Sequence, residues 1–467
     1  MKHCQLTICF LFSIMILPLV ISCRIVEKEK HPNVLFIAVD DLRPELGCYG
    51  NQTVRSPAID KLASQAVVFN RAYCQQAICM VSRASIMTGI LPDKNNLYCC
   101  GSVDDAMPDV LTLNKFFKEK GYKTESMGKI YHHRIDYDKQ FGDWIDGLNN
   151  PKWKHGSGPA YEALDVNDND YKDGYNANIA VDSLKKYAKS KESFFLALGF
   201  HKPHLPFFAP KKYWDLYSKE AIKLPDNQHL PENYIEHTKY NFGELRNYDG
   251  IPKGYDPLSE ELKINLKHGY YACVSYMDAQ LEKVLNTLEE TGLDKNTIVI
   301  LWGDHGWKLG EHGMWCKHTN FELDTRVPFI IKAPGVKAAI TDNFVELVDI
   351  YPTLVDLCGF EIPEHTEGKS LVKVMSKPDK LQYDKAFSLY PHNRGNKDKL
   401  VIGYTVRTED YRYIEWIHLK SGKTEGRELY NHRLDPDENI NIAAFKENAA
   451  ICKKYSEMLK TKWKMEL

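Results

Sequence analysis

The sequence has no excess of either charge. Its 467 residues include 61 Lys and Arg against 63 Asp and Glu, so the formal net charge is −2. Proteins that bind nucleic acid are usually basic, so this balance argues against a nucleic-acid partner, although it leaves room for a local basic pocket that binds a small anion. The 12 cysteines are too few for a disulfide scaffold in a chain of this length. A composition of 43% hydrophobic and 27% charged residues excludes a disordered or collagen-like chain.

Long apolar runs are missing after the N-terminal region, so we expect no transmembrane helix in the rest of the chain. Residues 1–23 combine a short basic start with an apolar run over residues 8–21, which is typical of a secretory signal peptide. Residues 20–23 read Val-Ile-Ser-Cys and resemble a bacterial lipobox, in which Cys23 would carry the lipid. A plain signal peptide and an uncleaved anchor helix are the alternatives. We expect an exported protein, in the periplasm or at the cell surface, held at a membrane surface by a lipid anchor.

Four short apolar runs predict buried β-strands. Between them, apolar residues three and four positions apart predict amphipathic helices, two of which end on Gly. This alternation predicts an α/β domain with a mostly parallel sheet. The predicted strands are residues 33–39, 193–199, 296–302 and 327–332, and the predicted helices are residues 56–66, 109–121 and 271–292.

The pattern changes near residue 375. After a polar linker over residues 24–31, we assign residues 32–375 to a large catalytic domain and residues 376–467 to a small C-terminal α+β subdomain. Residues 143–265 are rich in Tyr, Pro, Asn and Asp, which predicts long surface loops. In the subdomain, residues 385–391, 400–408 and 411–418 resemble antiparallel strands, and residues 445–467 resemble a closing amphipathic helix.

The first and third predicted strands are both followed by acidic residues. Asp40 and Asp41 follow the first strand, and Asp304 and His305 follow the third. Open α/β sheets bind ligands at the carboxyl ends of their strands, so these side chains are expected to converge. Three carboxylates at one edge would repel one another without a cation, and hard oxygen ligands favour Ca²⁺ or Mg²⁺ over Zn²⁺. The alternative is that each acidic pair only caps a helix or a turn.

A cysteine opens a further predicted helix. Cys79 stands at its start, and Arg83 follows four residues later. Helix N-terminal amides attract anions, and Arg adds a planar pair of donors for an oxyanion. Taken alone, this pattern is a weak indication, because a cysteine near an arginine is usually a buried thiol. The order of the residues around Cys79 carries more information.

The segment Cys79-Met-Val-Ser-Arg83 resembles the type I sulfatase signature, whose Cys is oxidised to formylglycine. Further blocks resemble the same family in the expected order and cover nearly all of the mature chain, and they are similar to the branch that contains iduronate-2-sulfatase. The resemblance implies an α/β fold of the alkaline-phosphatase-like type, with a large mixed sheet flanked by helices and a smaller C-terminal subdomain made of an antiparallel sheet and a helix. The blocks are residues 33–50, 128–132, 199–207, 303–317, 407–413 and 428–431.

The resemblance also implies a role for each matching residue. A formylglycine-generating enzyme would convert Cys79 to formylglycine, and the metal would be Ca²⁺ or Mg²⁺. Taken singly, a lysine such as Lys129 is usually a solvated surface group, and a histidine such as His204 is usually structural. The metal ligands would be Asp40, Asp41, Cys79, Asp304 and His305. Arg83 would steady the hydrated aldehyde, Lys129 and Lys317 would hold the sulfate oxygens, His132 would assist the formylglycine hydroxyls, His204 would protonate the leaving alcohol, and His201 and Lys202 would line the pocket.

Two positions depart from the maturation signal of the family. Val81 stands where the family has Pro, and Met80 replaces a small residue, which puts efficient oxidation of Cys79 in question. An unmodified Cys79 would leave a sulfated-glycan binding protein rather than a catalyst. The other alternative is a phosphatase or phosphonate hydrolase of the same superfamily, but the Ser or Thr nucleophile and the His-rich zinc sites expected of it are not found.

The predicted substrate is a sulfated sugar in a polysaccharide or its oligosaccharides, of the ulvan, carrageenan or glycosaminoglycan type. A sulfate ester carries spread negative charge, which lysines and a metal ion stabilise in the transition state. Aromatic and basic side chains within residues 143–265, together with His392 and Arg394, are candidate sugar contacts. Most of the remaining cysteines are expected to be buried thiols.

Overall fold

The computed structural model describes residues 31–99, 102–133, 136, 144–145, 156–393 and 396–464. The predicted signal peptide, Cys23, most of the predicted linker and Arg394 lie outside the described residues, so the predictions made on them stay predictions. From Pro32 onward the chain forms one compact unit.

The centre of this unit is a nine-stranded sheet in which β1 (Asn33–Val39) lies between β6 (Phe194–Phe200) and β8 (Thr297–Gly303). Both neighbours run parallel to β1, and all residues of the three strands are buried, as expected of central parallel strands. The sheet is mixed, because β12 (Phe329–Lys332) runs antiparallel to β8. The other strands are β2 (Val67–Tyr73), β3 (Lys123–Gly128), β4 (Trp144–Ile145), β11 (Arg326–Val327) and β13 (Ala339–Glu346).

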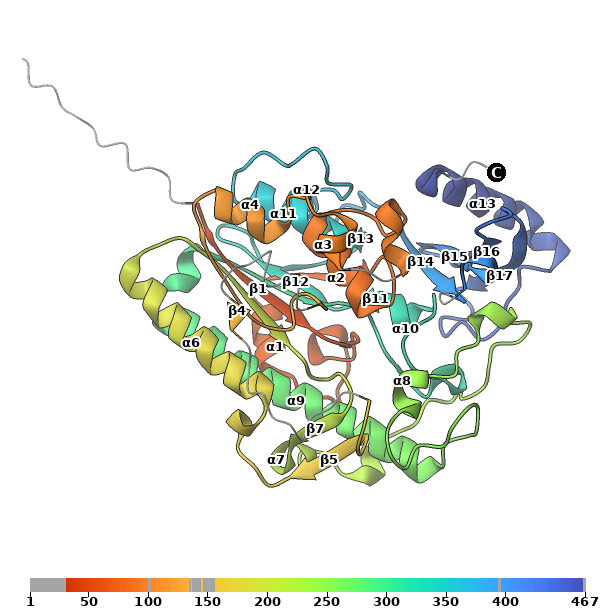
Figure 1. The fold of residues 1–467 in the computed structure, drawn as a ribbon, viewed down its shortest axis with the longest axis horizontal. Coiled ribbons are helices and arrows are strands. Elements are labelled where there is room, and N and C mark those ends of the chain that lie inside the picture. Colours follow the sequence, from red (N-terminus) through yellow and green to blue (C-terminus); the bar gives the residue numbers. More distant parts are fainter. Residues whose placement is uncertain are drawn as a thin grey trace, which may run out of the picture. The chain divides into compact units, whose positions relative to one another are not determined.

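Helices cover both faces of this sheet, as Figure 1 shows. The mixed sheet between two helical layers confirms the predicted α/β class. One layer contains α1 (Pro57–Ala63), α6 (Lys172–Ser190) and α9 (Glu260–Glu290), and the other contains α2 (Cys79–Thr88), α4 (Leu113–Glu119) and α11 (Ile350–Leu357).

The prediction that residues 143–265 form long surface loops is wrong for α6 and for the start of α9. α6 is a 19-residue helix, and α9 begins at Glu260 instead of residue 271. α6 buries Ala177, Ala180 and Leu184 on one face and packs on α9. Its Asp, Asn and Gly residues have low helix propensity, so packing on α9, rather than local preference, stabilises this helix.

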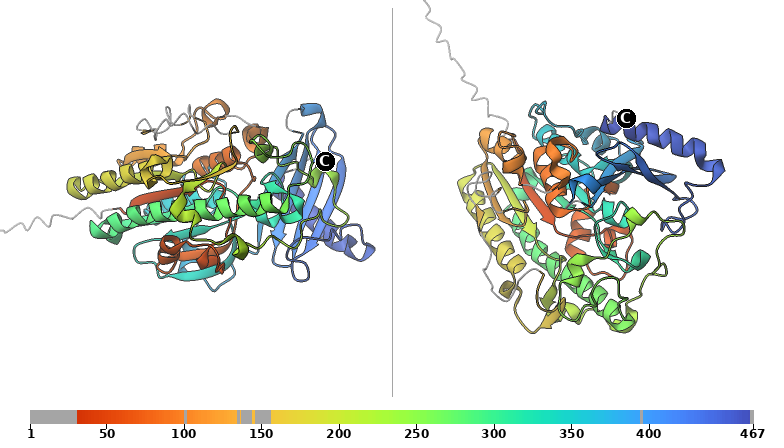
Figure 2. Two further views of the ribbon diagram at one scale, coloured as in Figure 1. Left: turned by 90° about the horizontal axis from the view of Figure 1, so that it is seen from below. Right: turned by 45° about the vertical axis from the view of Figure 1, so that its right-hand side comes forward.

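The C-terminal region forms its own antiparallel sheet, visible as the blue strands of Figure 2. Leu389, Val406 and Leu459 belong to a hydrophobic cluster that this sheet shares with the last helix. Three strands and the helix were predicted, whereas β17 was not, because the first half of its sequence is polar. The proposed boundary at residue 375 stays a prediction. The elements are β14 (Lys385–His392), β15 (Val401–Thr408), β16 (Tyr411–His418), β17 (Thr424–Asn431) and α13 (Ala449–Trp463).

Buried ion pairs connect this sheet to α10 (Glu322–Thr325). Arg412, on β16, is 1% exposed, and its guanidinium lies 2.5 Å from a carboxylate oxygen of both Glu322 and Glu438. Arg407 adds a contact of 3.0 Å to Glu322. Burial would raise the pKa of Glu322, but Arg407 and Arg412 hold it well below its usual range. Removing Arg412 would take one positive charge from two buried carboxylates, leaving Glu322 with Arg407 and Glu438 with His432 as their remaining partners.

Replacing Arg412 with Met is therefore expected to lower the free energy of unfolding by about 3–5 kcal/mol. Chemical denaturation followed by tryptophan fluorescence measures this change. Arg433→Met is the control, because Arg433 pairs with Asp410 at the surface, where ion pairs contribute little. An effect no larger than that of the control would contradict this role of the buried network.

Short elements connect the main layers. They are α3 (Val103–Ala106), α7 (Lys211–Trp214), α8 (Gly243–Arg246), α12 (Val372–Ser376), β5 (Tyr161–Leu164), β7 (Phe207–Pro210), β9 (Lys308–Leu309) and β10 (Trp315–Cys316).

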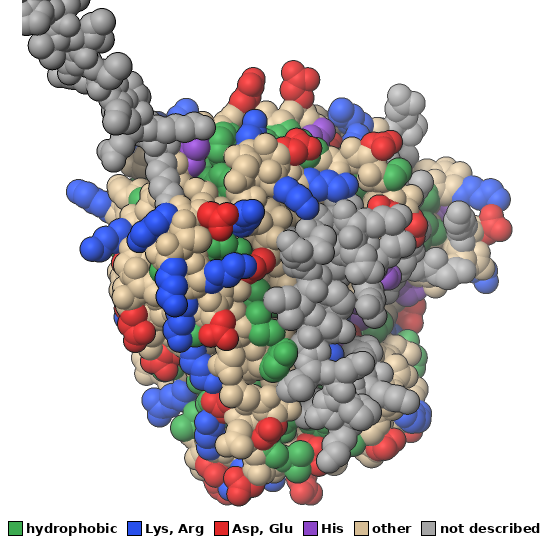
Figure 3. All heavy atoms as spheres, turned by 60° about the vertical axis from the view of Figure 1, so that its left-hand side comes forward, with side chains coloured by type: hydrophobic (Ala, Val, Ile, Leu, Met, Phe, Trp, Pro, Cys, Tyr) green, Lys and Arg blue, Asp and Glu red, His purple; other side chains and the backbone are tan. Residues whose placement is uncertain are grey.

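No helix within the described part of the chain is long and apolar enough to cross a bilayer. Basic and acidic side chains are interspersed over the face drawn in Figure 3, in keeping with the net charge of −2.

Candidate active site

Strand register places the acidic strand ends side by side. Val39, the last residue of β1, is paired with Phe200 of β6 and Gly303 of β8. The pairing continues for one more residue, because the Asp40 N–H donates to the Phe200 carbonyl (3.2 Å) and the Asp304 N–H donates to the Val39 carbonyl (3.3 Å). Asp40 and Asp304 are therefore neighbours at the carboxyl edge of the sheet, and both are fully buried.

Asp41 leaves the strand in an unusual backbone conformation. Its φ of 59° lies in the left-handed region, which Asp tolerates better than most residues. Its N–H donates to Oδ1 of Asp304 (3.1 Å), and its carbonyl accepts a hydrogen bond from the Tyr270 hydroxyl of α9 (2.8 Å). This turn keeps the Asp41 carboxylate inside the site, with Oδ1 3.0 Å from Nζ of Lys317.

Two glycines allow the end of β3 to lie close to the end of β6. Gly128, the last residue of β3, has a φ of 70° and is paired with Gly199 of β6. A Cβ atom on Gly128 would lie 1.9 Å from the Gly199 carbonyl oxygen, and one on Gly199 would lie 2.1 Å from the Lys129 carbonyl oxygen. Only glycine fits at both positions. The close approach lets Lys129 form an ion pair with Asp40.

Helix α2 presents Cys79 and Arg83 from one face. Cys79 is its first residue, and Sγ lies 3.1 Å from Nε2 of His305. Arg83, one turn later, is fully buried; its Nε lies 2.9 Å from Asp304 and its Nη2 lies 3.1 Å from Asp40. These contacts make Arg83 a residue that positions both carboxylates.

The two departures from the maturation signal occupy core positions of α2. All residues of this helix are buried, and the Met80 sulfur lies 2.9 Å from a ring nitrogen of His133. Val81 is fully buried. Burial raises the pKa of the Cys79 thiol, although the charge of Lys129 opposes this shift.

The residues present fit a divalent cation. Asp40, Cys79, Asp304 and His305 each offer one ligand atom, and these atoms all lie within 4.8 Å of one another. Nδ1 of His305 is 2.9 Å from the carbonyl oxygen of Gly306, so it acts as the donor there and Nε2 faces the cluster with its lone pair. The carboxylate oxygens of Asp40 and Asp304 are the hard ligands that Ca²⁺ or Mg²⁺ prefers, and the imidazole of His305 adds a nitrogen ligand.

Two lysines face the same carboxylates. Burial disfavours the Lys317 ammonium, but Asp41 raises its pKa well above the usual value. Burial likewise disfavours the charge of Lys129, and Asp40 raises its pKa. Burial would raise the pKa of Asp40, but Lys129 and His204 hold it well below its usual range. The lysines therefore stay charged at neutral pH and can bind an anion.

His204 lies beside this cluster. Its Nδ1 is 2.6 Å from the carbonyl oxygen of Leu205, so Nε2 points to the carboxylates, 3.7 Å from Asp41 and 4.0 Å from Asp40. Burial disfavours the protonated ring, yet Asp41 and Asp40 raise the pKa of His204 to about 10. A protonated imidazole in this place can donate a proton to a leaving oxygen.

The other predicted site residues surround the cluster. His132 has an exposed side chain, and Nδ1 of His201 lies 3.4 Å from Asp173 of α6. Lys202 is buried, and its ammonium donates to the carbonyl of His204 (3.0 Å), so it braces the loop that carries this histidine. The catalytic role predicted for His132 and the pocket-lining roles predicted for His201 and Lys202 stay predictions.

The structure adds Glu244 of α8, which sequence reasoning missed. Its carboxylate lies 2.9 Å from Nε2 of His204 and 2.9 Å from Nζ of Lys317, and its side chain is 11% exposed. Phe242, just before α8, has a φ of 45°, and Arg246 donates to three backbone carbonyls of the surrounding loop. No sequence signal marks Glu244, because a single Glu in a polar loop is typical of a surface charge.

Replacing Glu244 with Gln is expected to lower kcat by about 10–100-fold, because Lys317 and His204 would lose the charge that orients them. Steady-state kinetics on an aryl sulfate measure this effect. Glu236→Gln is the matched control, since the Glu236 side chain is 74% exposed and pairs only loosely with Lys239 at 3.8 Å. A kcat equal to that of the wild type would contradict the orienting role of Glu244.

The cysteines of the described residues bear out the expectation of buried thiols. All but Cys48 of these free cysteines are buried. Apart from Cys79, none is among the candidate site residues. The free cysteines other than Cys79 are Cys48, Cys74, Cys273, Cys316, Cys358 and Cys452.

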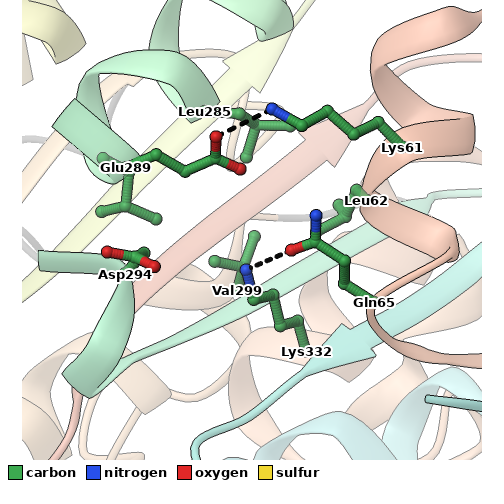
Figure 4. A pocket seen from close by; sticks show the side chains of 9 residues that line it. Lys61, Leu62, Gln65, Leu285, Glu289, Asp294, Val299 and Lys332 are labelled. Carbon is green, nitrogen blue, oxygen red and sulfur yellow. Dashed lines mark hydrogen bonds and ion pairs between the residues drawn. The ribbon is translucent and has the colours of Figure 1, made fainter. Parts of the chain in front are cut away.

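A hollow at another place on the molecule, drawn in Figure 4, holds none of these residues. It lies between α1 and α9, next to Val299 near the start of β8. Lys61 and Glu289 form an ion pair of 2.8 Å across it. Since β8 carries Asp304 at its other end, this hollow is at the opposite edge of the sheet from the acidic cluster.

The mixed sheet between two helical layers, with buried lysines and carboxylates at one edge, defines the class of protein: an α/β protein of the alkaline-phosphatase-like fold, whose centre suits an anionic ester. Comparison with known proteins narrows this class. The sulfatase family model matches residues 32–360, and the model of the N-sulphoglucosamine sulphohydrolase C-terminal region matches residues 310–465. The chain belongs to the sulfatase family, and the protein is an enzyme that hydrolyses sulfate esters.

Its relatives include iduronate 2-sulfatase of Mus musculus, which is 34% identical over 88% of this chain and 90% of the relative. A sulfatase of Formosa agariphila is 32% identical over 91% of this chain and 86% of the relative. A solved structure in complex with D-glucosamine-2-N,6-O-disulfate has a TM-score of 0.73 at 22% identity, covering 93% of this chain and 98% of the other. Phosphonate monoester hydrolase of Agrobacterium radiobacter has a TM-score of 0.75 at 19% identity, covering 92% and 95%. At these identities the two structures share the fold alone.

Proposed function

We propose that this sulfatase uses a formylglycine made from Cys79, together with a bound Ca²⁺, to remove sulfate from a sulfated sugar in a polysaccharide or its oligosaccharides. The observation that carries the proposal is the position of Cys79. Its Sγ lies 3.1 Å from Nε2 of His305 and belongs to the same ligand cluster as Asp40 and Asp304. Lys129 and Lys317 supply positive charge next to it. The 34% identity to iduronate 2-sulfatase supports a sulfated uronic acid or a related sugar as the substrate.

Two groups that these residues fit would supply the reactive chemistry. A formylglycine at position 79 would supply a hydrated aldehyde, whose second hydroxyl allows a sulfate ester to be cleaved by elimination, which serine or cysteine cannot do. Ca²⁺ would supply positive charge next to the sulfate oxygens. Its ligands would be residue 79, Asp40, Asp41, Asp304 and His305.

The side chains around the cluster would bind the ester and protonate the leaving alcohol. Lys129 and Lys317 would hold the sulfate oxygens, whose charge grows in the transition state. His204 would hold a proton on Nε2 and donate it to the leaving alcohol oxygen. Arg83 would steady the hydrated aldehyde, and its fully buried guanidinium would also keep Asp40 and Asp304 in place.

The route to the mature enzyme is part of the proposal. The protein would be exported, lipid-anchored through Cys23 and activated by a formylglycine-generating enzyme. Because Met80 and Val81 are buried in α2, these two departures from the maturation signal serve the core of the folded protein. Oxidation of Cys79 in the native host is the step on which catalysis depends.

Substrate comparison tests the proposed function. The full chain, produced in its native host, is assayed on p-nitrophenyl sulfate, p-nitrophenyl phosphate and sulfated oligosaccharides of the glycosaminoglycan, carrageenan and ulvan types, with released sulfate measured by ion chromatography. We expect sulfate release from at least one oligosaccharide class and faster turnover of the aryl sulfate than of the aryl phosphate. Faster turnover of the phosphate would favour a phosphoester hydrolase. Ligand binding without turnover, with Cys79 unmodified, would favour a glycan-binding protein.

A further inference from the structure

The segment 232–246, which ends in α8, is docked on the C-terminal sheet. The N–H of Glu232 donates to the carbonyl of Asn439 at 2.7 Å. Further along, the Thr238 hydroxyl donates to the buried carboxylate of Glu428 on β17 at 2.6 Å. These bonds fix the segment against the sheet before it enters the active site.

Ring side chains line the junction between this segment and β14. The ring centroid of His237 lies 5.1 Å from that of His392, and Tyr240 lies 4.8 Å from His318. The His318 ring is in turn 6.2 Å from Tyr390, which shares one face of β14 with His392 because the two are two residues apart. We call His237, Tyr240, His318 and His392 the ring cluster; each is neither fully buried nor fully exposed.

The ring cluster is continuous with the anion-binding centre. His318 directly follows Lys317, and Tyr240 precedes by four residues Glu244, which contacts Lys317 at 2.9 Å. Cys316 and His318, on either side of Lys317, have φ values of 69° and 89°. Left-handed conformations are strained for non-glycine residues and cluster at binding and catalytic sites. The backbone strain around Lys317 therefore marks this junction as functional.

The composition of the ring cluster suits a sugar. Ring faces of Tyr and His can pack against the C–H face of a pyranose, as in other ligand sites that combine aromatic walls with a few placed polar groups. A neutral imidazole also offers one donor and one acceptor, which match a sugar hydroxyl. A hydrogen bond between His237 and the carboxylate of Glu425, at 2.8 Å, holds one of these rings in place.

We propose that the ring cluster is a subsite for the sugar residue next to the sulfated one, so that the enzyme recognises an oligosaccharide rather than a single sulfated sugar. This inference rests on the proposed function, because it assumes that Lys317 holds the sulfate of a sugar. A chain bound in this way extends from Lys317 over Tyr240 and His318 toward His237 and His392.

The test compares a long and a short substrate. The long one is the tetrasaccharide fragment of the sulfated polysaccharide with the highest turnover, and the short one is p-nitrophenyl sulfate. His237→Ala and His392→Ala are each expected to lower the ratio of kcat/KM for the long substrate to that for the short one by about tenfold, because each removes a ring that would pack against the neighbouring sugar. His229→Ala is the control, because His229 is exposed and contacts the carbonyl of Leu230; the ratio should stay as in the wild type.

A binding measurement makes the test independent of catalysis. In a Cys79→Ala background, isothermal titration calorimetry with the same tetrasaccharide should show a Kd about tenfold higher for His392→Ala. Thermal melts identify any alanine variant that fails to fold. His237→Phe or His392→Phe then replaces it, because phenylalanine keeps a ring face but loses the hydrogen bonds.

The outcomes separate this proposal from the proposed function. Unchanged ratios in both variants, together with an unchanged Kd for His392→Ala, would overturn the subsite and leave the sulfatase mechanism standing. No sulfate release from either substrate by a wild-type protein that carries formylglycine would overturn the proposed function itself.

Discussion

Replacing Cys79 with Ala is expected to reduce sulfate ester turnover by at least about 10³-fold, since the loss of a nucleophile removes the covalent route altogether. The change removes one small, buried side chain at the start of α2, so the fold should survive. Steady-state kinetics on p-nitrophenyl sulfate and a thermal melt measure the two effects. Cys452→Ala is the matched control, because Cys452 is a free thiol of α13 in the C-terminal region.

Peptide mass spectrometry completes this experiment. In active wild-type protein, the peptide that contains residue 79 should have the mass of formylglycine, and its fraction should scale with activity across preparations. Met80 and Val81 are buried in the core and depart from the maturation signal, so the fraction of Cys79 that is converted to formylglycine is informative. Full activity in protein whose Cys79 is entirely unmodified, or near-normal activity of Cys79→Ala, would contradict the assigned nucleophile.

Replacing Asp304 with Asn is expected to lower activity by roughly 10²–10³-fold or more, because the site loses a metal-ligand charge and the orientation of its neighbours. The Asp304 carboxylate accepts hydrogen bonds from the backbone N–H groups of Asp41 and His305, each at 3.1 Å, and lies 2.9 Å from Nε of Arg83. One substitution therefore acts on both the cation and the backbone turn that places Asp41.

Metal analysis by mass spectrometry, together with kinetics, checks this result. The wild type should hold about one Ca²⁺ per chain and lose activity on dialysis against a chelator, with recovery when Ca²⁺ is returned. Asp304→Asn should hold less metal at the same free Ca²⁺ concentration. Asp294→Asn, a change at a residue of the short helix before β8, is the control. Wild-type metal content and wild-type turnover in Asp304→Asn would show that the acidic cluster is not the metal site.

The strand ends could be predicted from the sequence because their geometry follows from local pattern. A buried run such as residues 33–39 is recognisable from its apolar side chains, and parallel strands expose their carboxyl ends at one edge. Asp40 and Asp304 had to be neighbours once β1 and β8 were adjacent. The spacing of Cys79 and Arg83 likewise places both on one side of a helix.

The partners of these residues depend on contacts between distant segments. Glu244 and His237 lie in a segment whose sequence has no helical or strand periodicity, so no local pattern shows that they meet Lys317 and His392. Helix α6 was missed for a related reason: its polar sequence has weak helical preference, and burial against α9 stabilises it.

The local pattern of apolar runs and acidic strand ends thus indicated the α/β class and the centre of the site, and the resemblance of the motif blocks indicated the family. The docking of the segment 232–246 on the C-terminal sheet placed Glu244 and the ring cluster next to that centre. Periodicity and strand ends are properties of neighbouring residues, whereas loop docking depends on hydrogen bonds and packing between residues nearly 200 positions apart, such as Thr238 and Glu428. Only the folded chain brings such residues together.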